Sequence, residues 1–199
     1  MARNPLYIFL LKGALWLPVC LGLWYWKAEW FNGPAVIMSG WILKFFFSGW
    51  VESVEWSQRI LSVATTLKLG MVPGMPDGEY ALVLEVNPLT YGFGLPLFVA
   101  LFLANSGEIC WRNLTLGTLL LIPFQAWGIC FDLLKQAAVT IEPIVSEQTG
   151  FSQWEIEGIA LGYQFGALIL PALAPIGMWL AFNPRFIPMM VLEGALRKF

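Results

Sequence analysis

The sequence predicts a mainly helical, polytopic membrane protein with four transmembrane helices, and with an interfacial helix and a small external β-hairpin between the first two. Hydrophobic residues make up 58% of the 199 residues and charged residues only 12%, whereas soluble domains have about half and about a quarter. The mean hydropathy is +0.70. We expect a single membrane domain over residues 1–199, with an external insertion at 27–88 and four spans at about 6–26, 89–104, 114–139 and 154–182.

The first apolar run, residues 6–26, ends in Trp24, Tyr25 and Trp26. Aromatic side chains of this kind gather at the boundary between bilayer and water. A secretory signal peptide has a shorter apolar core, followed by small residues at its cleavage site. We therefore expect a retained first span, with Pro18 as the candidate for a kink.

Residues 34–50 are expected to form an amphipathic helix. Pro34 suits a helix start, and Trp41 and Phe45 recur at helical spacing. Charged residues such as Lys44 make a full crossing costly. A helix lying in the outer interface is the preferred interpretation, and a re-entrant segment is the alternative.

Residues 59–86 change to a period of two. Leu61 and Val63 in the first run, and Leu82 and Leu84 in the second, alternate with other residues. The sequence GMVPGMPDG between the runs is rich in turn-forming residues. This pattern predicts a β-hairpin with one sheltered face. Because an isolated hairpin is marginal in water, it must rest on another element or on a partner.

The run at residues 114–139 carries polar side chains on one helical face. The residues of this face follow one another at steps of three and four: Gln125, Gly128, Asp132, Lys135 and Val139. Ionisable groups inside a bilayer turn toward protein or a water-filled cavity, so we expect this face, with the neighbouring Gln136, to contact other helices. The side chains expected to face lipid are Leu119, Leu120, Leu121, Ile122, Phe124 and Trp127.

Asp132 and Lys135 are three residues apart and can form an ion pair near the outer end of this span. A proton or ion relay, or a dock for a charged group of a partner, are the functional alternatives. Relays string several carboxylates or histidines across the membrane, whereas only Gln125 follows Asp132 inward. A structural or docking role is therefore favoured. Tyr91 and Tyr163 are expected to donate hydrogen bonds across helices.

The last span, residues 154–182, contains Gly158, Gly162 and Gly166 at steps of four. Glycines at this spacing let another helix backbone approach closely. Packing within the chain is the favoured interpretation, and docking of a partner helix is the alternative. Pro171 is expected to bend the helix beyond this glycine face.

The composition argues against several kinds of chemistry. The chain has no histidine, which is the commonest general base and neutral metal ligand. Its cysteines, at positions 20, 110 and 130, are far apart and read as inert thiols rather than as a metal site. The net charge of −2 and the lack of a basic run do not suit nucleic acid. We expect no cofactor, no metal and no nucleic-acid partner.

The basic residues indicate an orientation. With four spans, the N-terminus, the loop at 106–113 and the C-terminal tail share one side. That side holds six of the 11 basic residues but two of the 13 acidic residues. Basic residues in short loops favour the cytoplasm, so both termini are expected there.

Three motifs carry a resemblance to a known family: EVNPLTYGFGLPL (Glu85–Leu97), PFQAWGICFDLLKQ (Pro123–Gln136) and ALGYQFGALILPALAPI (Ala160–Ile176). They resemble the exosortase H-associated membrane proteins of Gram-negative bacteria. The resemblance implies association with an exosortase, an inner-membrane enzyme that processes C-terminal sorting signals of exported proteins. It supplies no catalytic residue. Exosortases are similar to transpeptidases that use Cys, Arg and His, so a chain without histidine is expected to be an accessory protein, not an enzyme.

These observations leave three functional hypotheses. The first is an accessory subunit that binds an exosortase or its substrates through the polar face, the glycine face and the external hairpin. Its candidate packing or docking residues are Gln125, Asp132, Lys135, Gln136, Gly158, Gly162, Tyr163 and Gly166. The second is a component of an oligomeric transporter or channel, with Gln125, Asp132 and Lys135 lining a path. The third, a membrane enzyme, has the least support.

Overall fold

A computed structural model describes residues 5–57, 59–69, 80–105, 110–140, 143–184, 186 and 188. The predicted hairpin turn at residues 70–78, the first part of the 106–113 loop and the tail after residue 188 lie outside the described residues.

The architecture is mainly helical, as predicted, and three helices among the described residues are long and apolar enough to cross a membrane. In chain order they are α1 (Pro5–Trp26), α5 (Trp111–Lys135) with its π-helical continuation η1 (Gln136–Thr140), and a helix made of α7 (Gln153–Gln164), the π-helical segment η2 (Phe165–Ile169) and α8 (Leu170–Phe182). The expected span at 89–104 forms the shorter helices α3 (Leu89–Gly92) and α4 (Gly94–Ala104). The fourth crossing therefore stays a prediction.

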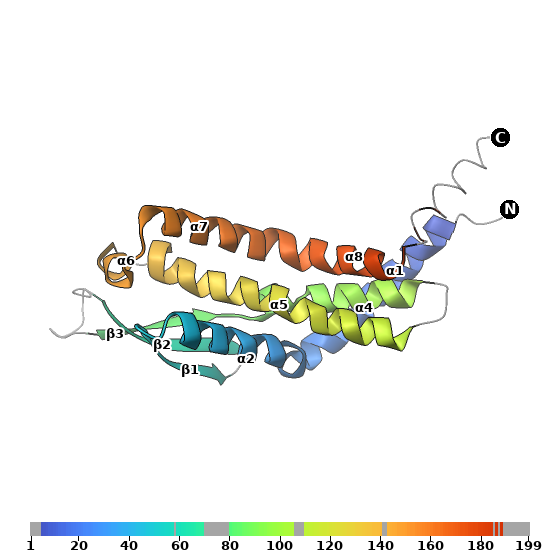
Figure 1. Cartoon of the computed structure of the whole chain (residues 1–199). Helices are drawn as coiled ribbons and strands as arrows, with labels where there is room; N and C mark the ends of the chain where they lie inside the picture. Colours follow the sequence, from blue (N-terminus) through green and yellow to red (C-terminus); the bar gives the residue numbers. More distant parts are fainter. Residues whose placement is uncertain are drawn as a thin grey trace.

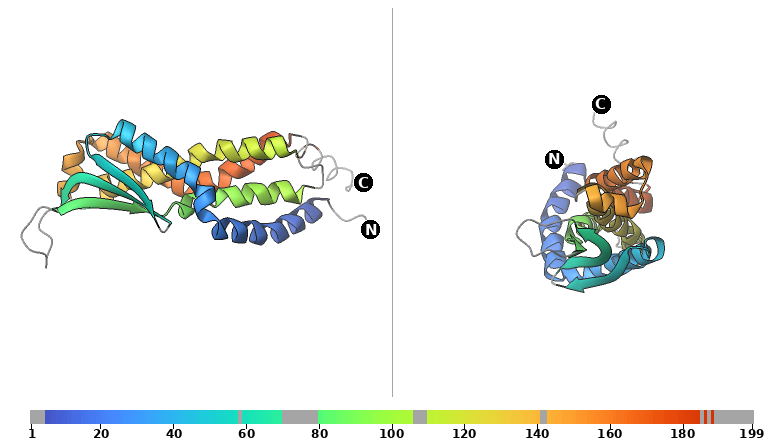
Figure 2. Two further views of the ribbon diagram at one scale, coloured as in Figure 1. Left: turned by 90° about the horizontal axis from the view of Figure 1, so that it is seen from below. Right: turned by 90° about the vertical axis from the view of Figure 1, so that its left-hand side faces the viewer.

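Helix α5 is the central element of the fold (Figure 1). Helices α7 and α8 lie along one side of α5, and α4 lies beside its N-terminal half. Helix α1 packs on α4, and α2 (Ala28–Phe46) packs against α5. The sheet lies at one end of the molecule, and α1 begins near the other (Figures 1 and 2). There the ring of Phe9 stacks on Trp179 of α8, with 5.1 Å between their centroids.

Helix α2 differs from the predicted helix at both ends. It begins at Ala28, directly after α1, so that Pro34 lies inside it. The backbone continues in helical hydrogen bonds from Leu23 through Lys27 to Phe31, which explains why the two helices are nearly joined. It ends at Phe46, before Trp50. Its placement in the interface stays a prediction.

The predicted hairpin is part of a three-stranded antiparallel sheet of order β1-β2-β3. The two predicted strands are β2 (Ile60–Leu69) and β3 (Tyr80–Val86), and they pair as expected. A hairpin alone was an incomplete prediction, because β1 (Val51–Ser57) pairs with β2 along its free edge. The added strand relieves the marginal stability of a two-stranded ribbon.

Helix α6 (Pro143–Thr149) ties the polar segment after α5 to the sheet. The amide of Gln148 accepts a hydrogen bond from the Lys68 backbone N–H at 2.8 Å and donates one to the Lys68 carbonyl at 2.9 Å. These bonds use backbone groups of β2 just before its end at Leu69.

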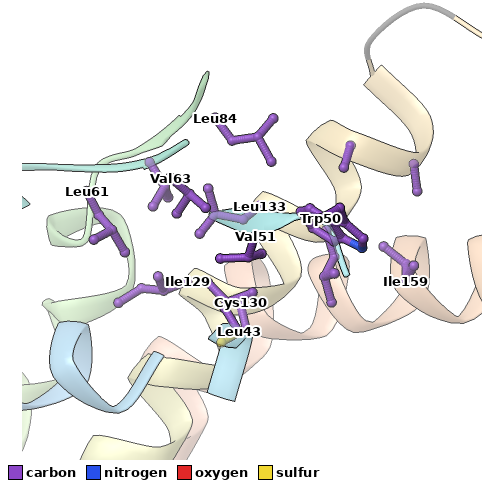
Figure 3. Close-up of a cluster of buried hydrophobic side chains, with 14 of the residues drawn as sticks. Leu43, Trp50, Val51, Leu61, Val63, Leu84, Ile129, Cys130, Leu133 and Ile159 are labelled. Atoms are coloured by element: carbon purple, nitrogen blue, oxygen red, sulfur yellow. The ribbon is translucent and has the colours of Figure 1, made fainter. Parts of the chain in front are cut away.

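Two hydrophobic clusters occupy opposite halves of the molecule. The cluster at the sheet end is mostly aliphatic and joins the sheet, α2, α5 and α7 (Figure 3). It includes Leu43, Val63, Leu84 and Leu133. The alternating residues of the predicted hairpin, Leu61, Val63, Leu82 and Leu84, all lie in this cluster, so its sheltered face is confirmed.

The cluster at the other end is rich in aromatic residues and joins α1, α4, α5 and α8. It contains Trp24, Phe98, Phe102 and Trp179. Leu121 belongs to it and is 2% exposed, so the prediction that this residue faces lipid was wrong. Helix α4 covers it: Leu95 and Phe98 pack in the same cluster.

The last span contains a π-helical segment, Phe165–Ile169, that includes Gly166 and ends two residues before Pro171, whereas the predicted bend beyond the glycine face stays a prediction. Proline lacks a backbone N–H, so the carbonyl group four residues earlier loses its usual donor. A wider π-helical turn is one way in which a helix accommodates such a defect.

Candidate functional site

The polar face predicted on α5 lies against α3 and α7. Gln125 and Gly128 are buried, Asp132 and Lys135 are half-buried, and Val139 is exposed. Tyr91 of α3 and Tyr163 of α7 both contact charged residues of this face. The structure therefore brings together the polar residues of three helices that are separated in the sequence.

Asp132 is at the centre of a hydrogen-bonded cluster. The Tyr91 hydroxyl group donates a hydrogen bond to the Asp132 carboxylate. The Nε2 group of Gln136 lies 3.4 Å from Asp132 Oδ1 and also donates to the Glu85 carbonyl oxygen of β3 at 2.9 Å. Because Tyr91 is 2% exposed, its hydroxyl group needs this partner. The cluster links α3, α5 and the sheet.

Lys135 contacts a tyrosine ring in the structure. Its Nζ atom lies 4.0 Å from the centroid of Tyr163. The sequence suggested that Lys135 pairs with Asp132. Instead, the Asp132 carboxylate contacts Tyr91 and Gln136, whereas the ammonium group lies over the electron-rich face of Tyr163. The hydrogen bond expected from the Tyr163 hydroxyl group stays a prediction.

Gln125 differs from the other polar residues of the face. It is 6% exposed, and its Oε1 atom has no hydrogen-bond partner among the described residues. A small space of about 10 Å³, lined by Tyr91, Gln125, Phe124 and Pro171 among others, lies beside it. A space of this size holds at most about one water molecule.

The glycines of α7 and η2 have different surroundings. A Cβ atom added at Gly162 would lie 2.1 Å from the Phe131 ring, and one at Gly166 would lie 2.9 Å from the Cα atom of Gly128. The Trp127 Nε1 group also donates to the Gly162 carbonyl at 3.0 Å. Gly158 has no atom within 4 Å of such a Cβ. Gly162 and Gly166 thus form the contact with α5, and Gly158 lies outside it.

Small residues on α2 extend this packing and were missed in the sequence. Asn32 and Ser39 are buried and donate hydrogen bonds to the Ala28 and Ala35 carbonyls one turn earlier. A Cβ atom at Gly92 of α3 would lie 1.8 Å from Asn32 Oδ1. The steps of four, three and four from Ala28 to Ser39 were the available signal, since small residues at this spacing allow close helix packing.

The polar residues of this face connect several elements of the fold. Asp132, Lys135 and Gln136 each contact a protein group from another element. In the searched part of the chain, which comprises the described residues, no group of three His, Cys, Asp or Glu side chains is placed to hold a metal ion. The contacts hold α3, α5, α7 and the sheet in fixed relative positions.

The long apolar helices and the buried polar face define a multi-span membrane protein. The family model for the exosortase H-associated membrane proteins matches residues 3–186, nearly the whole chain. The protein belongs to this family, as the sequence motifs predicted. No curated protein and no solved structure matches the chain significantly.

Proposed function

We propose that this protein is a non-catalytic accessory subunit that binds an exosortase, or a substrate of that enzyme, in the bacterial inner membrane. Membership of a family named for its association with exosortase H supports the choice of partner. The observation that carries the proposal is the outer face of α2, a row of apolar side chains that the described part of the chain leaves uncovered.

The α2 outer face consists of residues at steps of three and four: Trp30, Pro34, Ile37, Trp41 and Phe45. Trp30 is 81% exposed and Trp41 76% exposed. The opposite face of the helix is buried on α5 and β1. An exposed apolar row of this size marks an interaction surface. Tryptophan is also enriched among the residues that carry most of the energy of protein interfaces.

The position of α2 favours a protein partner over lipid as the cover for this face. Glu29 precedes the row and Lys44 lies just before its last residue, and the roughly 22 Å between these two charged residues is shorter than the hydrocarbon layer of about 30 Å. The sheet packs on the inner side of the same helix. We infer that the exosortase, and not lipid, covers the α2 outer face.

The polar and glycine faces of α5 and α7 serve the fold in this proposal. The contacts of Asp132, Gly162 and Gly166 within the chain support a packing role for these residues. The partner therefore binds on the outside of a helix that the polar cluster holds in place. The absence of histidine supports a non-catalytic role, since the transpeptidase-like chemistry then belongs to the exosortase.

We further propose that both termini are cytoplasmic and that the sheet is on the outer side. Six of the 11 basic residues lie on the side of the N-terminus, the 106–113 loop and the tail, which supports this orientation. The sheet end of α2 then faces the compartment in which exported proteins arrive.

The test is co-purification of the tagged chain with the exosortase H of the same organism in mild detergent. Trp41→Ala is expected to lower the amount of co-purified exosortase about tenfold or more, which is the loss typical of an interface hot spot. Trp111→Ala is the matched control, because Trp111 is 70% exposed at the first residue of α5, and that end of α5 extends beyond α2 (Figure 1). Failure of the unaltered chain to retain exosortase, or equal losses in both variants, would refute the proposal.

A further inference from the structure

A groove between α1 and α4 has walls that suit hydrocarbon. It measures about 210 Å³ and is lined by apolar side chains of α1 and α4, with Phe31 of α2 at one end. Cys20 and Leu23 belong to the α1 wall, and Val99 and Leu103 to the α4 wall. Figure 2 shows α1 and α4 side by side along this part of the molecule. An apolar space of this kind excludes water.

The groove ends where α1 passes into α2. The backbone N–H of Lys27 bonds to the Leu23 carbonyl, and the N–H of Phe31 bonds to the Lys27 carbonyl. Leu23 and Phe31 both line the groove, and Lys27 lies between them in the turn that joins the two helices. Glu29, two residues after Lys27, falls on another face of the helix.

A second cation lies at the same junction. The guanidinium group of Arg59 is 4.7 Å from the ring centroid of Tyr25, and Lys27 Nζ is 4.8 Å from the ring of Trp26. Both rings are exposed at the end of α1. An apolar groove that ends at two cations and two interfacial aromatic rings has the chemistry of a phospholipid site.

The backbone of Arg59 points to a use for its side chain. Its φ angle is 67°, in the left-handed region, which glycine adopts readily and in which other residues are strained. An arginine at this turn keeps a guanidinium group over Tyr25 at a backbone cost that glycine would avoid.

We propose that the groove between α1 and α4 binds an acyl chain of an anionic phospholipid, whose phosphate group lies against Lys27 and Arg59. The apolar walls receive the chain, and the two cations favour a headgroup with net negative charge. This lipid site is separate from the α2 outer face and does not depend on the exosortase.

The experiment is native mass spectrometry of the full chain, purified in mild detergent and titrated with phosphatidylglycerol or phosphatidylcholine. We expect one tightly held phosphatidylglycerol and weaker binding of phosphatidylcholine. Val99→Trp fills the groove and should weaken binding of both lipids at least tenfold. Leu119→Trp is its control, because Leu119 is 55% exposed on α5 and does not line the groove.

The variant Arg59→Gly distinguishes a loss of the headgroup contact from a loss of protein stability. It should weaken phosphatidylglycerol binding about fivefold while leaving phosphatidylcholine binding unchanged. Because glycine relaxes the left-handed backbone, thermal stability in lipid-free detergent should be equal or higher. Equal binding of the two lipids by the unaltered chain, or phosphatidylglycerol binding that survives Val99→Trp, would overturn the proposal.

Discussion

The helices α1 and α5 are both apolar enough to cross a membrane, but they occupy opposite environments. In the most apolar stretch of each helix, 6% of the α1 residues and 39% of the α5 residues are buried. Gly22 of α1 faces open space, whereas a Cβ at Gly117 of α5 would lie 2.1 Å from the Phe98 ring. Hydropathy alone cannot tell an outer helix from a central one.

Glycines and polar residues make the distinction. In lipid, apolar side chains gain little by leaving their solvent, so close packing and hydrogen bonds hold helices together. Helix α5 supplies both, through Gly128 against Tyr91 and through Asp132. The outer helices keep large aromatic side chains exposed, as Trp26 on α1 and Trp41 on α2 do. We infer that α5 is specialised for the fold, and α1 and α2 for external contacts.

Among substitutions that test the different roles of α5 and the outer helices, the largest loss of stability is expected at Gly166. Gly166→Ala would place a methyl group 2.9 Å from the Gly128 backbone, which cannot rotate away, so α5 and η2 must separate. We expect a loss of about 2–3 kcal/mol in unfolding free energy, the upper part of the range for overpacking. The measurement is reversible denaturation in mixed detergent micelles.

Gly158→Ala is the matched control for Gly166→Ala. An added Cβ at Gly158 meets no atom within 4 Å, so alanine should leave stability unchanged or raise it by up to about 1 kcal/mol through its higher helix propensity. Similar losses at both positions would contradict the assignment of a packed and an open end to this glycine face.

A smaller loss is expected when the Tyr91 hydroxyl group is removed. Tyr91→Phe deletes the donor to Asp132 and should cost about 1–2 kcal/mol in the same assay. Asp132→Asn keeps an acceptor oxygen and should cost less. Ion or proton flux through proteoliposomes that disappears in Asp132→Asn would instead support the transporter alternative.

The smallest change in stability is expected when Gln125 is substituted. Its Oε1 atom has no partner among the described residues, so Gln125→Met should change the unfolding free energy by less than about 0.5 kcal/mol or stabilise the protein. Thermal unfolding of the two proteins side by side gives the answer. A clear loss of stability would mean that the amide makes a bond inside the fold.

Much of this contrast was readable in the sequence, because it depends on local spacing. Steps of three and four placed Gln125, Asp132 and Lys135 on one face of α5, and the alternation in residues 60–69 predicted a strand. The predicted hydrogen bond of Tyr91 across helices is also present. These features follow from the geometry of one helix or one strand.

The features that the sequence did not predict depend on contacts between distant segments. Residues 51–57 form β1 only through pairing with β2, and their short polar-rich pattern carries a weak strand signal. Leu121 is as apolar as its exposed neighbours Leu119 and Leu120, and the packing of α4 buries it. Likewise, Asp132 had a charged residue three positions away but bonds to Tyr91 from another helix.

The most direct test of the central claim is photo-crosslinking in membranes that contain exosortase H. A benzophenone amino acid is introduced at Ile37 or Trp41 on the α2 outer face, and at the exposed Leu119 on α5. The account predicts crosslinks to the exosortase from positions 37 and 41 and none from position 119. Crosslinks from position 119, with none from α2, would contradict it.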